Sequence, residues 1–173
     1  MNQNYKHPKR KTKVVFVQLG SPSEPTTKAL RKYLRKFLGD PRVVDINPWL
    51  WKIILNFFVL PFRPKKSAKL YARIWDGESF PLITNTRDFT KNVEKELKEI
   101  DPESYVEVNY AFLLSPPYVH EVYDSWEDDL KKGIGATKLL VIPMFPQYSE
   151  STIASGIDAL AKELSKRVKI PTF

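Results

Sequence analysis

Two short apolar runs, each followed by a loop and a helical pattern, constrain the fold of this chain most strongly. Residues 14–19 have the sequence VVFVQL, and residues 138–142 have the sequence KLLVI. Continuous apolar runs that contain β-branched residues are typical of strands buried on both faces of a parallel sheet. Residues 26–38 place apolar side chains at helical spacing and are followed by Gly39, which predicts a helix after the first strand.

The rest of the chain alternates between the same two kinds of element. We predict two further strands, at residues 43–46 and 105–112, and the beginning of another at residues 169–173. Apolar spacing predicts helices at residues 49–60, 67–74, 83–100, 117–130 and 152–168. This order predicts an α/β fold, a doubly wound parallel sheet flanked by helices, with right-handed crossovers.

Length and charge suggest how the chain is organised and what it binds. A chain of 173 residues suffices for one domain, so we expect a basic N-terminal arm at residues 1–12 and a single α/β domain at residues 13–173. The net charge of +8 fits either an anionic small ligand or an anionic membrane surface. No nucleic-acid recognition motif is present, so nucleic acid is not an expected partner.

The absence of cysteine excludes disulfides, thiolate catalysis, iron–sulfur clusters and cysteine-based zinc sites within this chain. The first apolar run is too short for a secretory signal, and we expect a cytoplasmic location. The most hydrophobic stretch begins at Trp49 and ends at Leu60; we call it the lip segment. It is too short to span a bilayer and fits either a buried helix or an interfacial one, so peripheral membrane contact is also expected.

The loop after the second apolar run is the first candidate site. It has the sequence PMFPQYSEST over residues 143–152 and lies where open α/β sheets place ligands, at the carboxyl end of a strand. The alternative is a plain connection in which Ser149 or Ser151 caps the next helix. A second candidate is the basic tetrapeptide at residues 63–66, RPKK, expected as a turn. Its cations beside an apolar segment suit an apolar ligand with carboxylate groups, or they form a solvated helix start.

Other titratable residues are weaker candidates. The loop after residue 19 has one glycine, without the glycine pattern of a dinucleotide site or P-loop. Of the two histidines, His7 falls in the expected arm and His120 in a predicted helix, where a surface or packing role is expected. The acidic residues 127–129 are interpreted as a solvated helix face that balances Lys131 and Lys132.

Four ordered blocks of sequence carry a resemblance to a known family. They are residues 17–22 (VQLGSP), 33–44 (YLRKFLGDPRVV), 63–75 (RPKKSAKLYARIW) and 146–152 (PQYSEST). Together they resemble the N-terminal half of the ferrochelatases, enzymes of haem biosynthesis that insert ferrous iron into a porphyrin. The resemblance implies a chelatase-like fold, porphyrin and ferrous iron as substrates, and no permanently bound cofactor. Protoporphyrin and coproporphyrin users share these blocks, so the porphyrin stays open.

The resemblance also implies roles for residues that match the family's blocks. The lip segment corresponds to a lip that guards the porphyrin pocket and, in some members, touches membrane. The residues expected to bind porphyrin are Leu19, Arg63, Lys66, Tyr71, Phe145, Ser149 and Ser151.

The chain departs from the family at three places. Residues 79–81 are Ser-Phe-Pro where members carry Gly-Ser-Pro, and residues 112–116 lack the Arg-Tyr pair near the metal. The family's catalytic histidine and its acidic partner lie in a second domain, which this chain does not include, so we assign no catalytic or metal-binding residue here. Two expectations follow: the chain is the porphyrin-cradling half of a ferrochelatase, which the C-terminal half would complete, or it is a half-length, non-catalytic porphyrin-binding or interaction protein that forms a homodimer.

Overall fold

A three-stranded parallel sheet forms the centre of the molecule. The computed structural model describes residues 11–103, 106–133 and 136–167. The strands are β1 (Thr12–Gln18), β2 (Val106–Phe112) and β3 (Lys138–Pro143), in the order β2-β1-β3. Every pairing is parallel, with Val15 opposite both Asn109 of β2 and Val141 of β3. The α/β class predicted from the sequence is therefore confirmed.

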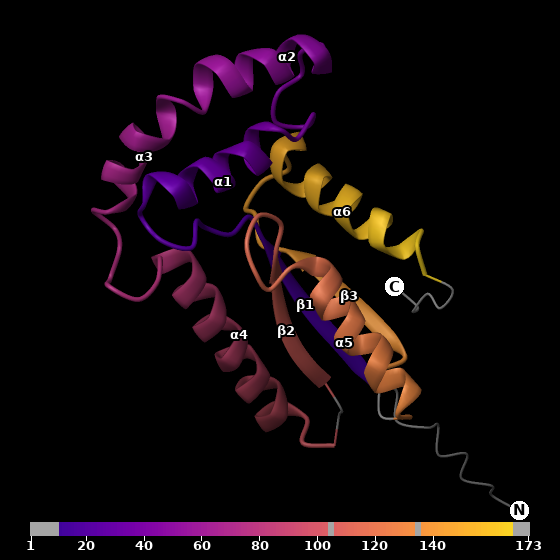
Figure 1. Cartoon of the computed structure of the whole chain (residues 1–173). Coiled ribbons are helices and arrows are strands. Elements are labelled where there is room, and N and C mark those ends of the chain that lie inside the picture. The colour runs from indigo at the N-terminus through magenta and orange to yellow at the C-terminus, as the bar shows by residue number, and fades with distance from the viewer. Residues whose placement is uncertain (1–10, 104–105, 134–135, 168–173) are drawn as a thin grey trace, which may run out of the picture.

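Helices cover both faces of this sheet because alternate side chains of β1 point to opposite sides. Val14 and Phe16 pack with Val108 beneath α4 (Pro81–Ile100), which supplies Val93 and Leu97. On the opposite face, Val15 and Val17 pack with Trp126 of α5 (Val119–Lys131) and Leu164 of α6 (Ser155–Leu164). Figure 1 shows α4 on one side of the strands and α5 with α6 on the other. The strand β1 is thus buried on both faces, as its apolar sequence predicts.

A group of helices lies beyond the carboxyl ends of the strands (Figure 1). It comprises α1 (Thr27–Leu38), α2 (Pro48–Ile54), the π-helical turn η1 (Leu55–Val59) and α3 (Arg63–Tyr71). The helix α1 begins where the Thr26 hydroxyl accepts a hydrogen bond from the Ala29 amide at 3.2 Å. Leu34 and Leu38 of α1 pack against Leu55 and Leu60, so a second apolar cluster attaches the lip segment to α1.

Two predicted elements differ from the structure. Residues 43–46 form no strand; the amides of Val43 and Val44 bond to the Asp40 carbonyl in a turn, and both side chains pack on the α1 cluster. The basic tetrapeptide is not a turn but the first turn of α3, with Pro64 at a position where a helix tolerates a missing amide hydrogen. Residues 1–10 of the expected arm and the predicted strand at 169–173 lie outside the described residues.

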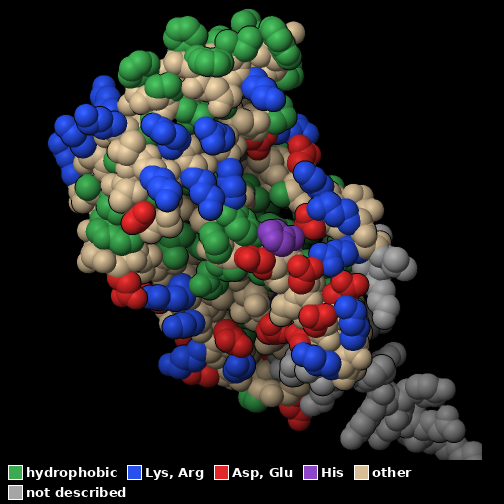
Figure 2. All heavy atoms as spheres, viewed as in Figure 1, with side chains coloured by type: hydrophobic (Ala, Val, Ile, Leu, Met, Phe, Trp, Pro, Cys, Tyr) green, Lys and Arg blue, Asp and Glu red, His purple; other side chains and the backbone are tan. Residues whose placement is uncertain are grey.

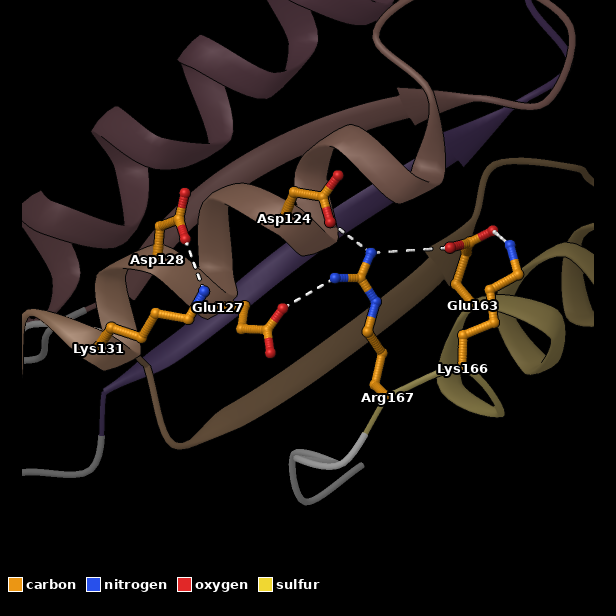
Figure 3. A network of polar contacts seen from close by, with 7 residues as sticks. All are labelled: Asp124, Glu127, Asp128, Lys131, Glu163, Lys166 and Arg167. Atoms are coloured by element: carbon orange, nitrogen blue, oxygen red, sulfur yellow. Dashed lines mark hydrogen bonds and ion pairs between the residues drawn. The ribbon is translucent and has the colours of Figure 1, made fainter.

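Ion pairs of Arg167, which lies three residues beyond the end of α6, join this part of the chain to α5, as Figure 3 shows. The Arg167 guanidinium contacts Asp124 and Glu127 of α5, the latter at 2.8 Å, and lies 3.8 Å from Glu163 of α6. The acidic stretch at residues 127–129 therefore does more than form a solvated face, because Glu127 is half-buried against Arg167. Asp128 does pair with Lys131, at 3.1 Å, as expected from the sequence.

Candidate functional site

The loops after β1 and β3 lie side by side at the carboxyl edge of the sheet. The Met144 amide donates to the Val17 carbonyl at 2.8 Å, and the Gln18 side-chain amide donates to the Met144 carbonyl at 2.8 Å. These bonds bring Leu19, which follows β1, to the same edge as the loop that contains Phe145. Because β2 and β3 flank β1 on opposite sides, this edge is where an open α/β sheet forms a ligand-binding crevice.

The hydroxyl groups of the β3 loop bond to one another. Ser149 Oγ lies 3.2 Å from Ser151 Oγ and 2.7 Å from Thr152 Oγ1. Ser149 occupies the cap position of the π-helical turn η2 (Glu150–Ala154), but its side chain makes no capping bond. Ser149 therefore stands at the cap position without making the side-chain bond of a capping residue. The half-buried hydroxyls form a small cluster that can donate hydrogen bonds to the edge of a ligand.

An ion pair that the sequence did not suggest borders this loop. Arg42, in the connection after α1, binds both carboxylate oxygens of Asp158 on α6, at 2.7 and 3.1 Å. The hydrogen bonds hold the pKa of Asp158 below its usual range and raise that of Arg42, which also feels the charge of Glu150. The two residues are 116 positions apart, so no local pattern reveals the pair.

Arg63 and Lys66 share an open hollow beside the lip segment. Both cations are exposed on α3, and Phe58, Phe62 and Leu70 form the apolar part of the hollow. Figure 2 shows hydrophobic side chains gathered over α2 at the top of the view, with Lys and Arg side chains directly below. Apolar surface next to fixed cations is the arrangement expected for an apolar ligand or surface that carries negative groups.

The lip segment is only partly buried. Leu55 and Leu60 face the α1 cluster, and the Trp51 indole donates to the Leu38 carbonyl at 2.6 Å. Trp49 is 76% exposed and Phe57 is 69% exposed. None of the described helices has the length and hydrophobicity that a bilayer span requires.

Tyr71 lies at the opposite end of α3 from Arg63, in an aromatic group. Its ring is 5.4 Å from that of Phe80 and 6.3 Å from that of Tyr33. Burial, together with the neighbouring Tyr71, raises the pKa of Tyr33 strongly, and the Tyr33 hydroxyl donates to the Gly20 carbonyl at 3.2 Å. Tyr71 is half-buried in this packing, and the hydroxyl that reaches the β1 loop is that of Tyr33.

The seven residues expected to bind porphyrin therefore fall into three groups. Leu19, Phe145 and the two serines lie at the β1–β3 edge, Arg63 and Lys66 in the hollow, and Tyr71 in the aromatic group. No hydrogen bond or ion pair between described residues connects the groups. A ligand as broad as a porphyrin would have to bridge them.

The positions where the family's Arg-Tyr pair is missing lie beside Leu19. The Leu113 and Leu114 amides donate to the carbonyls of Gln18 and Leu19, each at 3.0 Å. Leu114 packs on the α1 cluster, and Leu113 packs on the apolar cluster beneath α5. His120 is exposed and stacks on Tyr118 at 5.4 Å, as a surface role predicts. Among the described residues no group of three or more acidic or histidine side chains is placed to hold a metal ion.

Comparison with known proteins identifies the relatives of this fold and site. The family model described as Ferrochelatase matches residues 11–173. The ferrochelatase of Idiomarina loihiensis is 43% identical over 158 residues, covering 91% of this chain and 42% of that protein. The ferrochelatase of Marinobacter nauticus is 38% identical, covering 98% and 45%, and the coproporphyrin III ferrochelatase of Streptococcus mutans is 39% identical, covering 95% and 49%.

The chain spans slightly less than half the length of these relatives, whereas the match extends over nearly all of its own length. The family match agrees with the α/β fold and its parallel sheet. This chain belongs to the ferrochelatase family.

Proposed function

We propose that this chain supplies the porphyrin-cradling half of a protein that inserts ferrous iron into a porphyrin in haem biosynthesis. The observation that carries the proposal is the family match over residues 11–173, together with a carboxyl-edge loop that keeps the family's PQYSEST block. Porphyrin and ferrous iron are the proposed substrates, and no permanent cofactor is proposed. The relatives' names include both ferrochelatase and coproporphyrin III ferrochelatase, so both porphyrins belong in the test.

The proposed roles follow from the three groups of residues. Leu19 and Phe145 provide apolar contact with the macrocycle face, and Ser149 and Ser151 satisfy polar edges. Arg63 and Lys66 hold the propionates: Arg63 presents two parallel N–H donors to a carboxylate, whereas Lys66 acts as a point charge. Tyr71 borders the macrocycle on the α1 side.

Metal insertion also requires a base that accepts two pyrrole protons and a group that delivers the metal. We assign neither role to a described residue, because His120 is exposed and no group of metal-ligating side chains is found among the described residues. The base and the metal-delivering group are proposed to come from a second half of the kind that the relatives' extra length provides.

A second candidate function is a non-catalytic porphyrin-binding or interaction protein, assembled as a homodimer. The observation that favours it is the absence of the family's Arg-Tyr pair from residues 112–116, where Leu114 packs on the α1 cluster and its amide bonds to the Leu19 carbonyl. A monomer at high concentration, measured by light scattering during gel filtration, would count against the dimer.

A peripheral membrane contact through the lip segment is the third part of the proposal. Exposed aromatic side chains on α2 and η1 lie next to the cations of α3, as an interfacial helix requires. Sedimentation with vesicles that contain anionic lipid tests this contact. We expect Trp49→Ser with Phe57→Ser to abolish binding, whereas Phe89→Ser, an exposed aromatic on α4, should leave it unchanged.

The deciding experiment is an anaerobic absorbance titration with protoporphyrin and, separately, coproporphyrin, followed by ferrous iron. We expect a saturable Soret shift without metal insertion. Arg63→Gln and Lys66→Gln should each weaken binding roughly three- to tenfold. Lys69→Gln, on the same helix but outside the hollow, is the matched control. Absence of any shift, or conversion to haem by this chain alone, would refute the proposed division of labour.

A further inference from the structure

The ion pair between Arg42 and Asp158 joins two parts of the molecule that are otherwise separate in their polar contacts. The helix α6 begins beside the end of α1 (Figure 1), and the pair lies where they meet. Arg42 donates to the two carboxylate oxygens of Asp158 through Nε and Nη2, at 2.7 and 3.1 Å. Among the described residues, no other hydrogen bond or ion pair links the helices α1, α2, η1 and α3 to α6, η2 or the β3 loop.

A tight turn holds Arg42 on its side of the pair. The Arg42 amide donates to Asp40 Oδ1 at 2.8 Å. The amides of Val43 and Val44 donate to the Asp40 carbonyl at 3.0 and 3.2 Å, and both valine side chains pack on the α1 cluster. The guanidinium is thus presented from a backbone segment that is fixed to the end of α1.

A continuous helical segment connects Asp158 to the hydroxyl cluster of the β3 loop. The turn η2 runs directly into α6, and Asp158 lies in the first turn of α6. The Ser155 hydroxyl donates to the Glu150 carbonyl at 3.3 Å, where the two segments join. Because the segment is helical throughout, the position of Asp158 determines the positions of Ser149 and Ser151.

The charge of Arg42 also acts on η2 itself. The hydrogen bonds to Asp158 are the main cause of the raised pKa of Arg42, and the charge of Glu150 adds to it. Glu150 is the first residue of η2 and stands between Ser149 and Ser151. Both attractions therefore draw the start of the η2–α6 segment toward the turn after α1.

The pair is better suited to hold an orientation than to stabilise the fold. The Arg42 side chain is 41% exposed and that of Asp158 is 54% exposed, and pairs this exposed add little to global stability. Two parallel bonds between a guanidinium and a carboxylate, however, fix an angle as well as a distance. Since both residues stand on ordered segments, that geometry passes to the elements that carry them.

We propose that Arg42 and Asp158 form a clasp that sets the position of the β3 loop relative to the helices that carry Arg63 and Lys66. Both act through the elements that they join, as positioning residues. The consequence for ligand binding rests on the proposed function: the clasp fixes the span that a porphyrin bridges between the hydroxyl cluster and the hollow beside the lip segment.

Amide hydrogen exchange of the full chain without porphyrin tests the clasp directly. Arg42→Gln and Asp158→Asn should each speed exchange at least about threefold in peptides that cover residues 144–158, and leave peptides of β2 and α4 unchanged. Arg87→Gln is the matched control, because its ion pair with Asp88 on α4 is almost equally exposed, at 44% and 59%. Equal exchange of residues 144–158 in the parent and in all three variants would overturn the proposal.

Porphyrin affinity tests the consequence for the site. With protoporphyrin and with coproporphyrin, Arg42→Gln and Asp158→Asn should each raise Kd about three- to fivefold. The double variant should raise it no further, since either change alone removes the pair. Arg42→Lys keeps the charge but not the two parallel donors, so its Kd should fall between those of the parent and Arg42→Gln. Additive losses, or losses no larger than that of Arg87→Gln, would contradict the positioning role.

The two measurements separate this inference from the proposed function. If the parent binds neither porphyrin, the proposed function fails, and the exchange rates alone decide whether the clasp holds the β3 loop. If the parent binds and the Arg42 and Asp158 variants bind equally well, the proposed function stands and the clasp is refuted.

Discussion

A buried lysine at the amino end of the sheet offers a sharp test of how this fold is stabilised. The Lys13 side chain on β1 is 1% exposed, and its ammonium nitrogen lies 3.0 Å from Glu107 Oε1 on β2. The contact satisfies the distance of an ion pair but not the angles of a hydrogen bond, so the ammonium has charge compensation without good geometry. Asn109 donates to the same Glu107 oxygen at 2.7 Å. The ammonium therefore depends on one shared carboxylate.

The structure sets the expected change in unfolding free energy for two substitutions, one at each residue of this pair. Removing one partner of a buried pair costs about 3–5 kcal/mol, since a charge is left in the interior. The Glu107 side chain is 36% exposed, so water can reach the pair, and we expect Glu107→Gln to cost about 2 kcal/mol. Lys13→Met removes the cation and keeps much of the volume, so its stability should lie within about 1 kcal/mol of the parent or exceed it.

Urea unfolding followed by circular dichroism measures these free energies. The double variant with both changes should recover most of the stability that Glu107→Gln loses. Glu99→Gln breaks the exposed pair with Lys95 and is the control, with an expected effect below about 0.5 kcal/mol. If Glu107→Gln cost no more than Glu99→Gln, or if Lys13→Met were the more damaging change, the account of a poorly compensated buried charge would be refuted.

Three further changes test other parts of the molecule. The Trp126 indole, which is buried, donates to the Ala136 carbonyl at 2.7 Å, so Trp126→Phe should cost about 2 kcal/mol in urea unfolding; a smaller loss than that of a surface substitution would contradict this. The pKa of Asp158 is lowered by Arg42, so this pair stabilises fully above the pKa of an unfolded aspartate, about 3.9, and less as the pH falls. Asp158→Asn should thus flatten the acid side of a plot of unfolding midpoint against pH. The raised pKa of Tyr33 means that the folded state keeps this proton longer, so stability should fall as the pH rises above about 10, and less so in Tyr33→Phe.

The fold was largely predictable because its strands are short apolar runs that pack from both sides. The predicted strands at residues 14–19 and 138–142 correspond to β1 and β3, shifted by one or two residues at their ends. The helix α1 was predictable because its apolar stripe and terminal Gly39 are local signals. The strand predicted at residues 43–46 was wrong because side-chain burial there comes from packing on α1, not from pairing with a neighbouring strand.

The candidate site was predictable only where a local block carries it. The loop after β3 was found from its position behind an apolar strand, and the resemblance to the ferrochelatases supplied Arg63, Lys66 and Tyr71. The role of Arg42 was missed. Its partner, Asp158, lies 116 positions away, so the sequence block that contains Arg42 gives no sign of the pair.

The sequence by itself determined the α/β class, the family and the edge of the sheet where a ligand is expected, because periodicity and ordered blocks are local properties. Only the tertiary structure decided which side chains meet there. It separated the seven expected residues into three groups, packed Leu114 against the α1 cluster, and joined Arg42 to Asp158 across 116 positions of the sequence. Such contacts depend on how loops from different strands and helix starts come together in space, and the spacing of residues along one chain does not encode that geometry in any local form.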